Sequence, residues 1–276
     1  MAAVKKKVFN LKGNKHAQNN VISYAILAVL FVIVQIGIST GTMSSLMQGL
    51  LVPLCAYVIL AVSLNLTVGI LGELSLGHAG FMCVGAFASA FFSKMTVGTM
   101  PDLLRFILAL IVGMIVAGIF GILIGIPVLR LEGDYLAIVT LAFGEIVKNV
   151  INVLYVGRDS KGVHIAIKEA AGMHLEPDGE TIISGALGIS GTPKDSNYII
   201  GFILVLITLI VVLNLVNSRD GRAVMSIRDN RIAAEATGIN ITKYKLLAFS
   251  ISAAFAGMAG GLYAHNLFKL DRKSVV

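Results

Sequence analysis

Long apolar runs dominate the pattern of this chain, and short polar segments separate them. Seven runs are long enough, or nearly so, to cross a bilayer as a helix, because about 20 apolar residues span the hydrocarbon core. Most are apolar on every side, which is typical of helices in lipid. The pattern predicts an all-α, polytopic transmembrane bundle of about seven spans, at residues 21–38, 46–66, 79–92, 104–129, 135–156, 198–216 and 246–264.

The third run is short and follows a glycine-rich stretch, GILGELSLGHAG. Because glycines permit an irregular backbone, this stretch predicts a broken or re-entrant helix near 66–80. The N–H groups of a broken helix can face a carboxylate, as they do in transporters. The competing interpretation is a tight cytoplasmic turn followed by close helix packing. The candidate residues for either are Glu73, Gly77, His78 and Gly80.

Lys and Arg residues are distributed unequally between the segments that join the runs. If the basic tail of residues 1–20 is cytoplasmic, most of them lie inside, which satisfies the positive-inside rule. The same assignment places a loop at 157–197 outside the cell membrane and a basic loop at 217–245 in the cytoplasm. The short tail at 265–276 would lie outside, and its three basic residues oppose the bias.

Composition favours a membrane protein over a soluble one. The chain is 57% hydrophobic and only 13% charged, and its mean hydropathy is +0.88. A soluble domain carries about 25% charged residues. The net charge of +7 does not indicate nucleic-acid binding, because the basic residues lie between apolar runs rather than along one helix face. Cys55 and Cys83 lie within apolar runs, so neither a disulfide nor a metal site is expected.

Two of the runs carry small residues at every fourth position. Such stripes allow helix backbones to approach closely in lipid, where the hydrophobic effect cannot drive association. They predict helix-packing faces at Gly113, Ala117, Gly121 and Gly125, and at Ala253, Gly257 and Gly261.

The cytoplasmic loop predicts a short basic helix. Ser226 and Asp229 have the spacing of a capping box, and Gly238 suits the position after a helix end. One interpretation is an amphipathic helix held on the membrane surface by its arginines. The other is a docking helix that enters a groove on a cytoplasmic partner. Its apolar contacts would be Ile232, Ala233, Ala236 and Ile239, with Arg231 and Glu235 at the rim.

Three stretches of this chain resemble the permeases of branched-chain amino acid ABC importers, in particular the second permease of the liv-type system. They are RDNRIAAEATGINITKYKLLAF, LGELSLGHAGFMCVGAFASA and LRLEGDYLAIVTLAFGEIV. The resemblance implies a subunit of the bacterial inner membrane that pairs with a homologous permease, two cytoplasmic ATP-binding subunits and an extracytoplasmic substrate-binding protein. It implies leucine, isoleucine and valine as substrates, although the same fold family also serves urea and short amides.

The resemblance also implies that Ala234, Glu235, Ala236 and Gly238 contact an ATPase subunit. The chain departs from the family pattern at Thr237, where an apolar residue is usual, and no Pro follows Leu247. Members of the family generally continue with further hydrophobic crossings beyond GGLYAH, so this chain is expected to be short at the C-terminus.

Glu145 and Lys148 lie one helical turn apart near the middle of the fifth run. Ionisable residues at that depth indicate a role in function, although the two can also neutralise each other as a structural pair. An ion-coupled secondary transporter, in which Glu145 is the coupling group, is therefore the main alternative, and a purely structural membrane subunit is a third. No nucleotide-binding or metalloprotease motif is present, so we expect no catalysis and no cofactor in this chain.

Overall fold

The structure is a computed structural model that describes residues 15–131, 133–159, 162–167, 180–267 and 269–270. The chain forms two compact units, residues 1–49 and 50–276. The first unit holds α1 (Lys15–Ser39) and the start of α2 (Ser45–Asn65). The predictions made for residues 1–14 and 271–276 lie outside the described residues.

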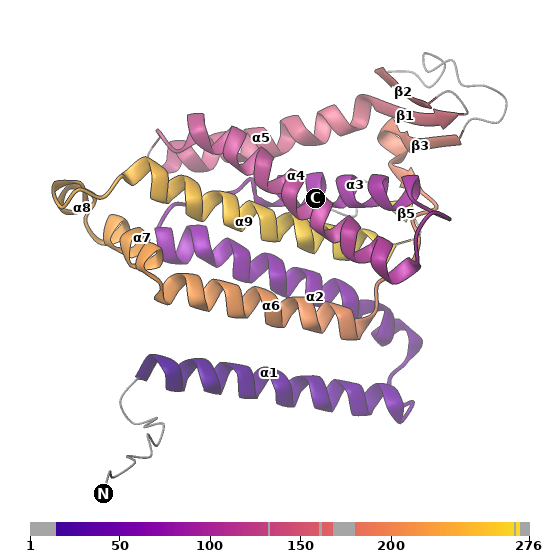
Figure 1. The fold of residues 1–276 in the computed structure, drawn as a ribbon, viewed down its shortest axis with the longest axis horizontal. Helices are drawn as coiled ribbons and strands as arrows, with labels where there is room; N and C mark the ends of the chain where they lie inside the picture. Colours follow the sequence, from indigo (N-terminus) through magenta and orange to yellow (C-terminus); the bar gives the residue numbers. More distant parts are fainter. Residues whose placement is uncertain (1–14, 132, 160–161, 168–179, 268, 271–276) are drawn as a thin grey trace, which may run out of the picture. The chain divides into compact units, whose positions relative to one another are not determined.

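The second unit is a helical bundle. After α2 the chain forms a π-helix (Leu66–Leu71), and the remaining helices are α3 (His78–Met95), α4 (Asp102–Val128), α5 (Asp134–Val153), α6 (Tyr198–Asn217), α7 (Arg219–Asp229), α8 (Arg231–Ala236) and α9 (Ile241–Ala264). Within this unit α7 and α8 lie at one end of the long helices, and a small sheet lies at the other end (Figure 1).

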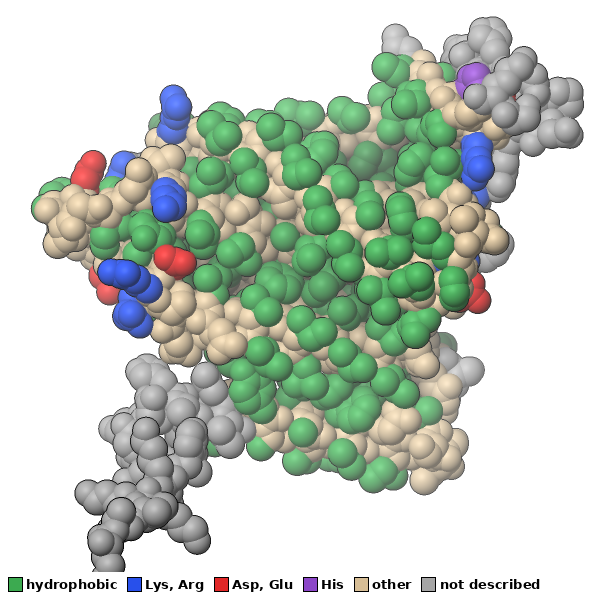
Figure 2. Space-filling view, in the orientation of Figure 1, with side chains coloured by type: hydrophobic (Ala, Val, Ile, Leu, Met, Phe, Trp, Pro, Cys, Tyr) green, Lys and Arg blue, Asp and Glu red, His purple; other side chains and the backbone are tan. Residues whose placement is uncertain are grey.

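Six of the described helices are long and apolar enough to cross a membrane: α1, α2 with its π-helical extension, α4, α5, α6 and α9. The short run at 79–92 forms α3, which is less apolar because it contains His78, two Ser residues and Lys94. This helix is mostly buried among its neighbours. The predicted polytopic bundle is therefore confirmed. Apolar side chains cover the face shown in Figure 2, and Lys, Arg and acidic side chains gather at the end with α7 and α8.

Helices α3, α4 and α9 pack through small residues. A Cβ atom on Gly257 of α9 would lie 2.3 Å from Ala117 Cβ and 2.7 Å from the Gly113 carbonyl oxygen of α4. Both stripes are therefore helix-packing faces, as predicted, and they pack against each other. Gly85 of α3 packs against the same point of α9, because its Cβ would lie 2.2 Å from Gly257 Cα. Such close approach allows many backbone contacts between these helices.

A five-stranded antiparallel sheet, which the sequence pattern did not predict, is formed by four strands between α5 and α6 and a fifth strand after α9. Its strands follow the order β2-β1-β3-β4-β5. They are β1 (Leu154–Asp159), β2 (Gly162–Ile167), β3 (Glu180–Ser184), β4 (Ile189–Ser190) and β5 (Lys269–Leu270). Val156, Ile183 and Ile189 of the sheet pack on Phe87 and Ala90 of α3. The sheet is therefore fixed to the bundle by an apolar core of its own.

Candidate functional site

The cytoplasmic loop predicted at 217–245 folds into two capped helices, not one. Asn230 ends α7, and its side chain accepts a hydrogen bond from the Ala233 backbone N–H at 3.0 Å, which starts α8. Ser226 lies inside α7 and donates to the Ala223 carbonyl oxygen, so the predicted capping box with Asp229 is wrong. An Asn side chain competes with the helix for backbone N–H groups, which explains the break.

Gly238 ends α8 as predicted. Its φ of +85° places it in the left-handed region that favours glycine. The Gly238 N–H donates to the Glu235 carbonyl oxygen, and the Ile239 N–H donates to that of Ala234, so the end of α8 is a Schellman motif. Both ends of this short helix are therefore fixed by specific hydrogen bonds.

The predicted docking residues of α8 divide into an outward set and an inward one. Ile232 is 81% exposed, although it is a large apolar side chain. Ala234 is only 4% exposed and packs with Ile227 and Ile241. Ala234 therefore holds α8 on the loop and does not face outward. The outward set consists of Arg231, Ile232, Ala233, Glu235, Ala236 and Gly238.

The loop is joined to the broken stretch near 66–80 by two polar contacts. Arg228 Nη1 of α7 donates to the Gly69 carbonyl oxygen of the π-helix at 2.9 Å. Lys245 of α9 forms a buried ion pair with Glu73. Both contacts border a cleft of about 290 Å³ at this end of the bundle. These contacts therefore connect α7 and α9 to the segment that precedes α3.

The broken stretch ends in close helix packing, not in an open binding site. The Leu76 N–H donates to Thr140 Oγ1 of α5 at 3.1 Å, and a Cβ atom on Gly77 would lie 2.3 Å from the Thr140 carbonyl oxygen. Gly80 packs against Gly144 in the same way. The space left there is only about 10 Å³, which is near the lower limit for a single water molecule. The packing interpretation is favoured over carboxylate binding.

His78 begins α3 inside the bundle. Its Nε2 lies 2.8 Å from Ser63 Oγ of α2, and Ser252 Oγ of α9 donates to the Ser63 carbonyl oxygen at 2.5 Å. A polar chain across three helices therefore fixes the start of α3. His78 is buried and acts within this chain as a structural partner.

Glu145 and Lys148 form the predicted ion pair on α5. Lys148 Nζ lies 2.6 Å from a Glu145 carboxylate oxygen. The Glu145 side chain is 51% exposed and that of Lys148 is 23% exposed, so the pair lies on the surface of this chain. The predicted mutual neutralisation is present, but the pair does not face the bundle interior.

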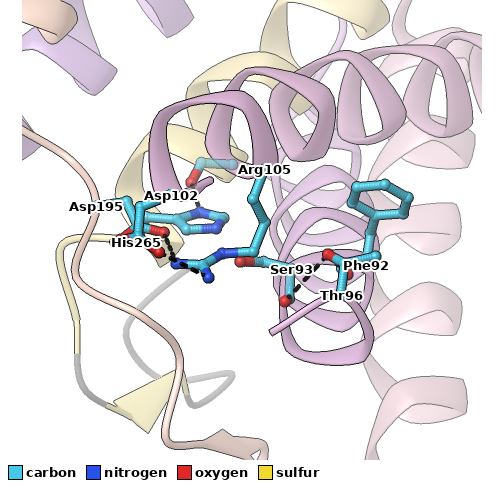
Figure 3. Close-up of polar contacts among 8 residues, drawn as sticks. Phe92, Ser93, Thr96, Asp102, Arg105, Asp195 and His265 are labelled. Carbon is cyan, nitrogen blue, oxygen red and sulfur yellow. Dashed lines mark hydrogen bonds and ion pairs between the residues drawn. The ribbon is translucent and has the colours of Figure 1, made fainter. Parts of the chain in front are cut away.

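A buried polar cluster lies where α4 begins and α9 ends, and sequence reasoning missed it. The Arg105 side chain is 5% exposed and pairs with Asp102 at 2.9 Å and with Asp195 at 2.7 Å. Figure 3 shows the guanidinium reaching toward Asp195, with the His265 ring beside it. Burial lowers the pKa of His265. The i, i+3 spacing of Asp102 and Arg105 was a weak signal for this cluster, but Asp195 lies far along the chain.

The family described as the permease component of the branched-chain amino acid transport system matches residues 46–270. The chain belongs to this family. Two curated relatives are the high-affinity branched-chain amino acid transport system permease proteins LivM of Salmonella typhimurium and Escherichia coli, which are 37% and 36% identical to it over 217 residues. The matches cover 75% of this chain and 50% of each relative, so the chain spans about half the length of these curated relatives.

A nucleoside ABC transporter permease protein, NupC of Lactococcus lactis, is 23% identical over 196 residues, which are 71% of this chain and 60% of that protein. No solved structure matches the chain. The family match includes the loop at 217–245, the broken stretch, the α5 ion pair and the Arg105 cluster. Within the described ranges, no group of three His, Cys, Asp or Glu side chains is placed to hold a metal ion.

Proposed function

We propose that this chain is a permease subunit of an ATP-driven importer of branched-chain amino acids in the bacterial inner membrane, with its N-terminus in the cytoplasm. It forms half of the translocation pathway, and a homologous permease forms the other half. Two cytoplasmic ATP-binding subunits drive transport, and an extracytoplasmic binding protein delivers the solute. Family membership and the LivM relatives support this assignment.

The observation that carries the proposal is the exposed, doubly capped helix α8. Its isolated apolar side chain, Ile232, projects from a basic loop, as expected of a helix that docks in a groove of a partner. Because α8 is fixed at both ends, movement of a bound partner is transmitted to α7 and α9 instead of being absorbed locally. An ion-coupled transporter does not need a docking helix. Glu145, the carboxylate that would couple such a transporter to an ion gradient, is already paired with Lys148.

The test is purification of the tagged chain after coexpression with the other proposed subunits, followed by leucine uptake in proteoliposomes. Glu235→Arg reverses a charge on the exposed face of α8 and is expected to release the ATP-binding subunits, whereas Glu235→Asp retains them. Gly238→Val strains the left-handed cap and is expected to act like Glu235→Arg, whereas Gly238→Asn is tolerated because Asn adopts this conformation.

Each alternative predicts a different result. Leucine uptake by the purified chain alone, driven by an ion gradient and lost in Glu145→Gln, would support the secondary transporter. Uptake of urea or short amides in place of leucine by the complete, ATP-driven complex would keep the transporter class and change the substrate. Retention of the ATP-binding subunits by all four variants would show that α8 is not the docking helix.

A further inference from the structure

The exposed side of α5 carries polar side chains at membrane depth. Glu145, Lys148 and Asn149 follow the spacing i, i+3, i+4, so they lie along one side of the helix. We call them the polar edge of α5. It lies in the C-terminal half of α5.

The polar edge faces away from the core of this chain. Glu145 and Asn149 are exposed. The buried residues of α5 are Leu136, Ala137, Thr140 and Ile151. Hydrocarbon offers no hydrogen bonds and no counter-charge, so polar side chains within a span normally face protein or water. Contact with lipid is therefore energetically unfavourable for this side of α5.

The Lys148 side chain does not extend its ammonium group toward the nearer membrane surface. A lysine near the end of a span usually extends its ammonium toward the nearer interface. Lys148 instead reaches back one turn toward the middle of α5 and contacts Glu145 at 2.6 Å. The charge is thus held one turn deeper in the span, where polar surroundings stabilise it better than hydrocarbon does.

The adjacent side of α5 is chemically different at the same depth. Ile146 and Val150 directly follow Glu145 and Asn149 in the sequence, and both are exposed. They line a groove of about 590 Å³ whose other residues, such as Phe120, Leu123 and Phe143, are also apolar. This apolar edge suits hydrocarbon, and it gives each polar position a control one residue away.

We infer that the polar edge of α5 faces the water of the translocation pathway, whereas the apolar edge faces lipid. This inference rests on the proposed function for its solute, but the accessibility of the two edges can be tested without knowing which solute is carried. The Glu145–Lys148 pair adds no net charge to the pathway, which suits a zwitterionic amino acid. Either member of the pair offers a partner to the ammonium or carboxylate of that solute.

The test is cysteine accessibility in the assembled transporter in membrane vesicles. Cys55 and Cys83, which are buried and free, are first replaced by alanine. Single variants Glu145→Cys and Asn149→Cys are compared with Ile146→Cys and Val150→Cys, using a charged, membrane-impermeant methanethiosulfonate. The polar-edge thiols are expected to react at least about tenfold faster, because water favours the reactive thiolate and hydrocarbon suppresses it. Recovery of the assembled complex confirms that each variant is folded.

Excess leucine is expected to slow the reaction at Asn149→Cys. If the polar edge reacts but leucine neither protects it nor is transported, the pathway assignment stands and the proposed substrate fails. Equal rates on the two edges would overturn the inference. So would unreactive polar-edge thiols that form disulfides with the homologous permease, because that result would make this side a dry subunit interface.

Discussion

Replacing Gly85 by alanine is expected to force α3 away from α9. The new Cβ atom would lie 2.2 Å from Gly257 Cα and 2.3 Å from its carbonyl oxygen. Ordinary contact begins at 3.4 Å, so the backbones must separate by the difference between 3.4 and 2.2 Å, about 1.2 Å. Overpacking costs about 1–3 kcal/mol, and we expect the upper end because a backbone cannot turn aside as a side chain can.

Gly118→Ala is the matched control. This glycine of α4 also faces α9, but a Cβ atom there would lie 3.4 Å from the nearest atom, Ala254 Cβ. Alanine is a better helix residue than glycine by about 0.5–1 kcal/mol, so the control is expected to be neutral or stabilising. The free energy of unfolding of both variants can be measured by denaturant titration in detergent micelles. Equal stability of the two variants would refute the argument from backbone contact.

Three further predictions concern polar contacts. Lys245→Met leaves the partly buried Glu73 carboxylate without its partner, and is expected to cost up to about 3 kcal/mol in the same unfolding assay. Adding Glu73→Gln should restore much of the loss. Arg105→Gln is expected to cost about 1–3 kcal/mol and to speed amide hydrogen exchange around Asp195, which loses its charge partner. Since burial lowers the pKa of His265, its stabilising contribution is complete above the unfolded pKa of about 6.5 and declines as the pH falls; thermal unfolding between pH 8 and 5 should show this decline, and His265→Gln should flatten it.

The long helices could be predicted from the sequence because each depends on a local property, an apolar run of bilayer length. The predicted runs at 198–216 and 104–129 differ by only a few residues from α6 and α4. The packing faces at Gly113 and Gly257 were also predictable, because small residues at every fourth position mark such a face, but the contact between the two was seen only in the structure. The sheet was not predicted, since its strands are short and its last pairing, of β4 with β5, joins residues that are far apart in the sequence.

The candidate site was predicted only in part, for the same reason. The cap at Gly238 follows from a local rule, and so does the contact between Glu145 and Lys148. The break at Asn230 was missed because the helical pattern appears continuous across it. Links such as Arg228 to Gly69, or Arg105 to Asp195, join distant parts of the sequence, so no spacing rule indicates them.

The pairing of β4 with β5 has a consequence for biosynthesis. Strand β5 follows α9, whereas its partner β4 precedes α6. The pairing of Ile189 with Leu270 can therefore form only after α9 has been synthesised. During translation the loop between α5 and α6 therefore emerges with one edge of β4 unpaired, and this edge pairs with β5 only after α9 has been inserted. A protease added during translation is expected to cleave this loop until β5 has paired with β4, so the onset of resistance to cleavage would report when that pairing forms.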